Sequence, residues 1–94
     1  MDKRVALIGI IIEKYKSAQK VNSVLHEYGD YIIGRMGIPY REREISIISV
    51  ALDAPSNIIS ALSGKIGMID GAYTKTIYSK TSKEESHETF NRKT

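Results

Sequence analysis

The chain has 94 residues, a length that suits one small domain and excludes two independent cores, and its 41% hydrophobic and 27% charged residues are typical of a folded protein. It contains no cysteine, which excludes a disulfide framework, a thiolate metal site and a cysteine nucleophile. The net charge of +3 is spread along the chain and does not by itself indicate a nucleic-acid partner.

Residues 5–12 form an unbroken apolar run, which predicts a central strand that is apolar on both faces. A membrane-spanning helix needs about 20 apolar residues, so we expect no membrane segment and a cytoplasmic protein. Apolar side chains then recur at spacings of three and four over residues 18–28. This periodicity predicts an amphipathic helix that ends at Gly29.

A hairpin is expected next. Residues 31–40 predict a second strand, and Pro39 places it at an edge of the sheet because proline has no N–H to donate to a strand ladder. Residues 41–44 predict the turn. Residues 45–52 predict a third strand, which again carries large apolar groups on both faces and is therefore central.

A second helix is expected to follow, with Asp53 or Ala54 as its cap and Pro55 near its first turn. It should end near Gly71. Its apolar face comprises Ile58, Leu62, Ile66 and Ile69. Both predicted helices therefore have one apolar stripe with which to cover a sheet.

The C-terminal part of the sequence contains the last strand and a polar extension. Residues 72–79 alternate in polarity and predict a short fourth strand. Residues 80–94 contain one large apolar residue, Phe90, and predict a mobile tail beyond a domain of residues 1–79. A short helix that packs through Phe90, or a contact with a partner, is the alternative.

The order strand, helix, strand, strand, helix, strand is that of the ferredoxin-like α+β fold, a βαββαβ sandwich. It predicts an antiparallel sheet of order 4-1-3-2 with both helices on one face. The other face would then be an apolar patch larger than soluble monomers usually expose. Burial of about four or five such side chains is worth roughly 6 to 15 kcal/mol, so we expect a homo-oligomer packed sheet on sheet. A monomer whose tail folds over the sheet is the alternative.

Two clusters of glycines and basic residues supply candidate ligand contacts. Gly64 and Gly67 fall inside the second helix, where each costs about 1 kcal/mol relative to alanine. Close packing would explain them, and a small anionic ligand held with Lys65 is the alternative. Arg35 and Arg41 can grip a carboxylate or phosphate, although surface or inter-subunit ion pairs would also explain them.

Other chemistries find little support in the sequence. The two histidines, His26 and His87, have no second ligand at a helical or hairpin spacing, so we expect no metal and no cofactor. No acid–base pair or nucleophile elbow is evident, which argues against an enzyme. The third strand carries Ile, Ser and Val where aromatic residues would stack on RNA, which disfavours recognition of nucleic acid.

Three segments carry a resemblance to a known family: RMGIPYRE (residues 35–42), ALSGKIG (residues 61–67) and KVNSVLHEYGD (residues 20–30). They resemble the iron-only hydrogenase system regulators, over about residues 4–78. The resemblance implies a ferredoxin-like fold related to ACT domains and to the ligand-binding domain of nickel-responsive regulators, which assemble through their sheets. The metal ligands of the nickel-responsive relatives are missing, and residues 13–17 replace the glycine-rich turn with which many ACT domains bind amino acids.

The sequence therefore predicts an oligomeric, non-enzymatic regulatory domain that senses a small anionic molecule or a protein partner. All predicted strands and helices belong to the one domain, so no segment remains for a helix-turn-helix or ribbon–helix–helix unit. A structural protein–protein interaction subunit without a ligand, its glycines serving packing, is the alternative, and an enzyme comes third.

Overall fold

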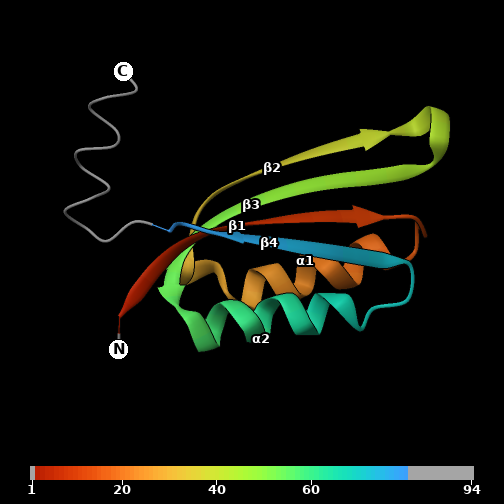
Figure 1. Cartoon of the computed structure of the whole chain (residues 1–94). Helices are drawn as coiled ribbons and strands as arrows, with labels where there is room; N and C mark the ends of the chain where they lie inside the picture. Colours follow the sequence, from red (N-terminus) through yellow and green to blue (C-terminus); the bar gives the residue numbers. More distant parts are fainter. Residues whose placement is uncertain (1, 81–94) are drawn as a thin grey trace, which may run out of the picture.

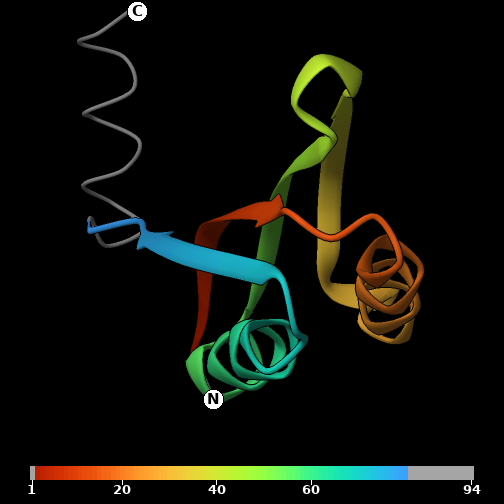
Figure 2. The ribbon, with the colours of Figure 1, turned by 90° about the vertical axis from the view of Figure 1, so that its right-hand side faces the viewer.

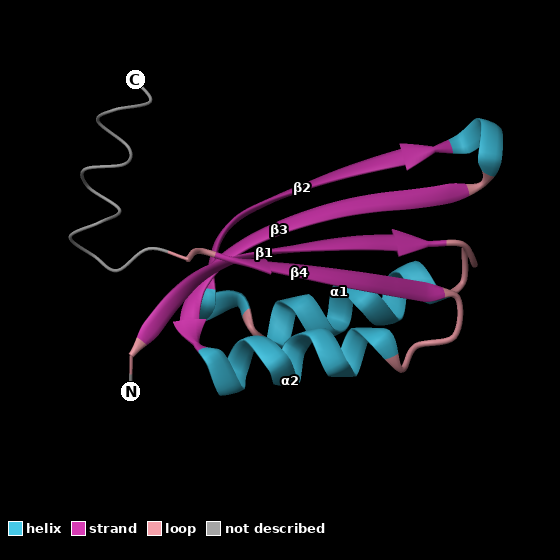
Figure 3. Cartoon of the chain, viewed as in Figure 1, coloured by secondary structure: helices cyan, strands magenta, loops and turns pink. Residues whose placement is uncertain are grey.

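The computed structural model describes residues 2–80, which form a four-stranded sheet with two α-helices on one face (Figure 1). Helices and strands are distinguished by colour in Figure 3. In chain order the elements, with two 3-10 helices marked η, are β1 (Lys3–Ile12), α1 (Ser17–Glu27), η1 (Gly29–Tyr31), β2 (Ile32–Tyr40), η2 (Arg41–Arg43), β3 (Ile45–Pro55), α2 (Ser56–Gly67) and β4 (Ala72–Tyr78).

The sheet has the strand order β2-β3-β1-β4, and each neighbouring pair is antiparallel. Read from the other edge, this is the order 4-1-3-2 that the sequence predicts. The ferredoxin-like α+β fold is therefore confirmed, with the two most apolar strands at the centre and the proline-bearing strand at an edge.

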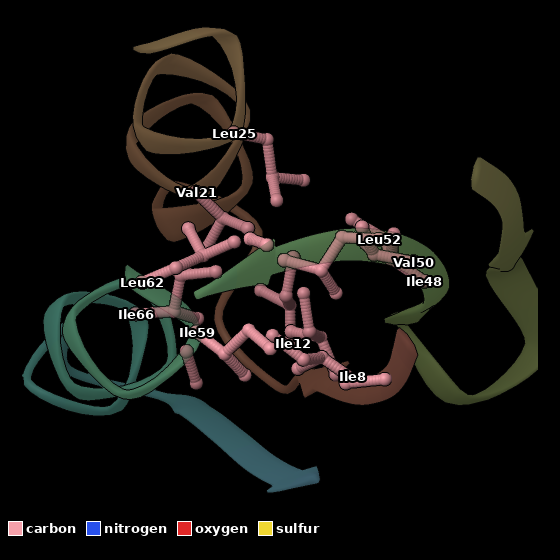
Figure 4. Close-up of a cluster of buried hydrophobic side chains, with 14 residues drawn as sticks. Ile8, Ile12, Val21, Leu25, Ile48, Val50, Leu52, Ile59, Leu62 and Ile66 are labelled. Carbon is pink, nitrogen blue, oxygen red and sulfur yellow. The ribbon is translucent and has the colours of Figure 1, made fainter. Parts of the chain in front are cut away.

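The core lies between the sheet and the two helices. Side chains of β1 alternate, and from Ala6 to Ile12 those on the helix-facing side are at most 2% exposed. Their neighbours on β3 are buried in the same layer, and side chains of α1 and α2 pack onto both strands (Figure 4). The largest fully buried side chains are Ile8, Ile10, Ile12, Val21, Leu25, Val50, Leu52, Ile59, Leu62 and Ile66.

Neither α1 nor α2 covers the opposite side of the sheet (Figure 2), which is called the open face below. Eight of its large apolar side chains are 36% to 66% exposed in the protomer, and Ile45 and Ile47 of β3 on the same face are half-buried. The open face is thus the apolar surface expected from central strands that are apolar on both sides. Its exposed large apolar residues are Val5, Leu7, Ile11, Met36, Ile38, Tyr40, Tyr73 and Ile77.

The predicted cap of the second helix is wrong. Asp53 and Ala54 continue β3 and pair with Val5 and Arg4 of β1, because the apolar Ala54 is fully buried in the core layer. The residue that precedes α2 is Pro55, whose side chain makes no capping hydrogen bond. Helix α2 therefore begins directly after the last residue of β3 that pairs with β1, and not at Asp53.

The predicted apolar face of this helix is correct in part. Leu62 and Ile66 are fully buried, as expected. The third buried residue is Ile59, while Ile58 is half-buried and Ile69 lies beyond the end of the helix. The predicted tail lies outside the described residues except for Lys80.

The connection from β1 to α1 contacts the connection from α2 to β4 at one end of the fold. Lys14, after β1, forms an exposed ion pair with Asp70, after α2, and the Ser17 hydroxyl donates a hydrogen bond to the Asp70 carbonyl. The hydrogen bond and charge of Lys14 lower the pKa of Asp70, and Asp70 raises the pKa of Lys14 in return. Gly71 completes this contact, because its backbone carbonyl accepts a hydrogen bond from the Glu13 N–H at 2.7 Å.

Gly71→Ala is expected to lower the free energy of unfolding by about 1 to 3 kcal/mol. Gly71 has a φ of 85°, and an added Cβ would lie 2.7 Å from Cγ and 2.8 Å from Cβ of Lys14. These two Lys14 atoms are close to the backbone, so they can move away from the added Cβ only at a substantial cost in free energy. Urea denaturation at fixed protein concentration measures the change.

Gly64→Ala is the matched control for this substitution. An added Cβ at Gly64 meets nothing within 4 Å in the protomer. Removing a glycine from a helix should then raise the free energy of unfolding by about 0.5 to 1 kcal/mol. Similar losses in the two variants would contradict this account of Gly71.

Candidate functional site

The five candidate residues lie in three different places. Arg35 is on β2, on the helix-facing side, because its cross-strand partner is the buried Val50. Arg41 is in η2, at the far end of the β2–β3 hairpin (Figure 1). Gly64, Lys65 and Gly67 are on α2, beneath the sheet in the same view.

A hollow of about 230 Å³ lies between the start of α1 and the helix-facing side of the β2–β3 hairpin. It exists because the helix-facing positions of β2 and β3 carry small side chains here: Gly37 has none, and Pro39 and Ser46 fill little space. Its lining residues are Ile12, Ala18, Asn22, Arg35, Gly37, Ile38, Pro39, Ser46, Ile47 and Ile48. Of the five candidates, only Arg35 lines this hollow.

Arg35 is held at the rim of the hollow by α1. Its Nη2 donates a hydrogen bond to Oδ1 of Asn22 over 2.6 Å. A guanidinium has five N–H donors, and within residues 2–80 Asn22 is the only side chain that accepts one from Arg35. The other N–H groups of the guanidinium can therefore donate hydrogen bonds to a carboxylate or a phosphate group.

Intrachain ion pairs do not account for the two arginines. Within the described part of the chain the salt bridges are Lys14–Asp70 and Lys65–Glu27, and neither includes Arg35 or Arg41. Arg35 therefore has a neutral partner in this protomer, and the inter-subunit ion pairs considered from the sequence remain a prediction.

Lys65 is directed toward the end of α1. Its Nζ lies 3.9 Å from Oε1 of Glu27 and 5.2 Å from the centre of the Tyr28 ring. Both ends of the ion pair are more than half exposed, so it contributes little to stability. A ligand that used Lys65 would have to draw the ammonium group away from these two neighbours.

The two glycines of α2 are not explained by close packing within the protomer. An added Cβ at Gly64 would meet nothing within 4 Å, and one at Gly67 would make an ordinary contact of 3.8 Å with Oγ1 of Thr74. The close packing that the sequence suggested is therefore not found at either glycine within residues 2–80. Both glycines are exposed and lie outside the hollow beside Arg35.

Sequence reasoning missed two polar features that the fold assembles. Asn22 of α1 joins Arg35 only through tertiary contact, and nothing in its helical context marks it. The hydroxyls of Ser63, Thr74 and Thr76 meet between α2 and β4, at distances of 3.2 and 3.3 Å from the Ser63 Oγ. The alternation of Thr74 and Thr76 along β4 was the available signal for the second feature.

The described residues offer neither a metal site nor a membrane-spanning helix. Within residues 2–80 no group of three or more His, Cys, Asp or Glu side chains is placed to hold a metal ion. No helix in this part of the chain has the length and apolar character needed to cross a membrane.

Known proteins resemble the chain over most of its length. A model of the TM1266-like family, described as "Iron-only hydrogenase system regulator, putative", matches residues 4–76. The structure of TM1266 from Thermotoga maritima is 36% identical with a TM-score of 0.80, and the match covers 84% of this chain and 100% of that one. No curated protein sequence matches the chain.

A more distant structure shows the same fold in another setting. Formyltetrahydrofolate deformylase from Pseudomonas putida KT2440 is 13% identical with a TM-score of 0.56. The match covers 77% of this chain and 28% of the enzyme. At this identity the likeness shows the fold alone, and the activity of the enzyme does not follow from it.

Proposed function

The chain belongs to the TM1266-like family of iron-only hydrogenase system regulators, and from this membership we propose that it is an oligomeric, non-enzymatic domain that senses a small anionic molecule. The observation that carries the proposal is the position of Arg35, whose guanidinium stands at the rim of a hollow and is fixed there by Asn22. The domain acts through this effector and through protein partners, without direct contact to nucleic acid.

The chemistry of the hollow favours a small anion. Its volume of about 230 Å³ lies below the usual range of drug-sized pockets, which begins at about 300 Å³, so it suits a ligand of few atoms. Arg35 supplies the positive charge, and Asn22 and Ser46 supply neutral hydrogen-bonding groups. Among the described residues that line the hollow none is acidic, so no carboxylate competes with the ligand.

The open face supports the oligomeric part of the proposal. β1 and β3 pair over ten residues. At about 3.4 Å per residue and about 4.8 Å between strands, a four-stranded face of this length offers roughly 600 to 700 Å². Stable interfaces bury about 800 Å² on each partner, so a second copy packed on this face approaches the standard size.

The distribution of charge on the open face also suits a second copy. Between the two ends of the open face, Lys75 is the one charged side chain among the described residues. It lies on the edge strand β4, where its ammonium group can reach water. Residues 81–94 contain Phe90 as their only large apolar residue, too little to cover eight exposed apolar side chains. We therefore propose a homo-oligomer joined through the open face.

Arg35→Gln is expected to abolish the stabilisation of the protein by inorganic phosphate. A ligand at 100 times its Kd stabilises a protein by about 2.7 kcal/mol, which raises the Tm of a small domain by roughly 10 to 20 °C. Glutamine keeps a polar side chain but loses the charge and the paired donors. Thermal unfolding with phosphate or with chloride at equal ionic strength measures the effect.

Arg43→Gln is the matched control, because it removes the same charge from η2, outside the hollow. It should keep the full response to phosphate. A response equally lost or equally retained in the two variants would contradict the site at Arg35. A wild-type protein that stays folded and shows no response would favour a structural interaction subunit without a ligand.

A further inference from the structure

The hollow and the open face lie on opposite sides of the same two strands. Gly37 and Ser46 line the hollow from the helix-facing side of β2 and β3. Their chain neighbours Ile38 and Ile47 are paired with each other across the two strands and point to the open face. Ile38 and Ile47 also border the hollow, so adjacent residues of these two strands carry the candidate ligand contacts and the candidate subunit contacts.

This part of the hairpin is weakly supported by the rest of the protomer. Every residue from 34 to 44 is exposed, whereas the helix-facing side chains of β1 from Ala6 to Ile12 are at most 2% exposed. Figure 2 shows the hairpin rising away from both helices toward η2. Elements with so few buried contacts are the ones that change position at low free-energy cost.

Few contacts fix the position of the hairpin relative to α1. Between β2 and α1, the Arg35–Asn22 hydrogen bond is the one side-chain hydrogen bond among the described residues. The ladder of β2 on β3 also contains an irregularity between Ile32 and Gly34. Such a bulge bends a strand locally. β3 is held by its ladder with β1 as far as Ser46, so the part of the hairpin whose angle can change is the edge strand β2 together with η2.

We propose that an anion bound in the hollow fixes the edge strand β2 against α1 and thereby strengthens the binding of a second copy to the open face. This inference rests on the proposed anion site, and it adds that anion binding there regulates self-association. A ligand that touches Arg35, Asn22 and Ser46 bridges three elements, so its affinity depends on the position of β2. The same position sets how Ile38 of β2 is presented to the partner beside Ile47, which β1 holds in place.

Sedimentation equilibrium of the full chain, in inorganic phosphate and in chloride at equal ionic strength, tests this linkage. Phosphate should lower the Kd of self-association at least about five-fold in the wild-type protein and in Arg43→Gln, the lower end of typical allosteric couplings. Arg35→Gln should show no change. Linkage is reciprocal, and a dimer holds two sites, so the monomeric variant Leu7→Asp should bind phosphate more weakly than the wild-type dimer by the square root of that factor, about two-fold per site or more, measured by titration calorimetry.

The outcomes separate the two proposals. Phosphate that binds in calorimetry, with equal affinity for wild type and Leu7→Asp and without effect on self-association, would overturn the linkage and leave the sensing function standing. Absence of phosphate binding in wild type would overturn the anion site and the linkage with it. A wild-type protein that is monomeric at all concentrations, in phosphate and in chloride, would also overturn the linkage.

Discussion

Leu7→Asp should convert the protein into a folded monomer. Leu7 lies on the central strand β1, is 42% exposed on the open face, and pairs with Ala51 on one side and Ile77 on the other. A two-fold contact would bury the new carboxylate in both copies, at a cost of several kcal/mol for each unpaired charge. We expect self-association to weaken at least about 1000-fold, as measured by sedimentation equilibrium.

The adjacent residue gives the matched control for this prediction. Ile8 lies on the same strand, faces the helices and is fully buried. Ile8→Asp should therefore unfold the protomer, with loss of its circular dichroism spectrum, while Leu7→Asp should keep that spectrum. If Leu7→Asp self-associated as strongly as the wild-type protein, the open face would not be the subunit interface.

The arrangement of the strands could be predicted because its determinants are local. The apolar run of β1 and the proline of β2 assign a central and an edge position without knowledge of tertiary contacts. The side of β1 that faces the helices could not be predicted in the same way, because both sides carry large apolar groups. Packing decides it, and Gly9 then lies on the open face, opposite Ser49.

The start of α2 shows where local signals fail. Asp53 and Pro55 look like a helix cap and a first-turn proline, and both residue types are common there. The ladder with β1 extends to Pro55 because it adds hydrogen bonds and buries Ala54, and this tertiary gain outweighs the local preference. The position of the helix was thus predictable and its first residue was not.

The sequence indicated that the candidate site carries positive charge, but it did not indicate how the side chains of the site are arranged. The arginine-rich segment suggested Arg35 through its charge, but the hollow depends on how α1 sits under the hairpin. One available signal was the phase of β2, because Arg35, Gly37 and Pro39 all point to the helix-facing side and leave space beside the guanidinium. The pairing of Arg35 with Asn22 required the fold, since it joins two elements across the layer.

Leu62→Ala is expected to lower the free energy of unfolding by about 2 to 5 kcal/mol, a large part of the roughly 5 to 15 kcal/mol that stabilises a small domain. Leu62 is fully buried, and with Ile59 and Ile66 it attaches α2 to the sheet (Figure 4). Met68→Ala removes a side chain of similar size that is 87% exposed, so it should change stability by less than about 0.5 kcal/mol. Urea midpoints at one protein concentration compare the two, since subunit association adds to apparent stability. Comparable losses would mean that Met68 is buried by a partner, and the contact surface would then extend from the open face to the end of α2.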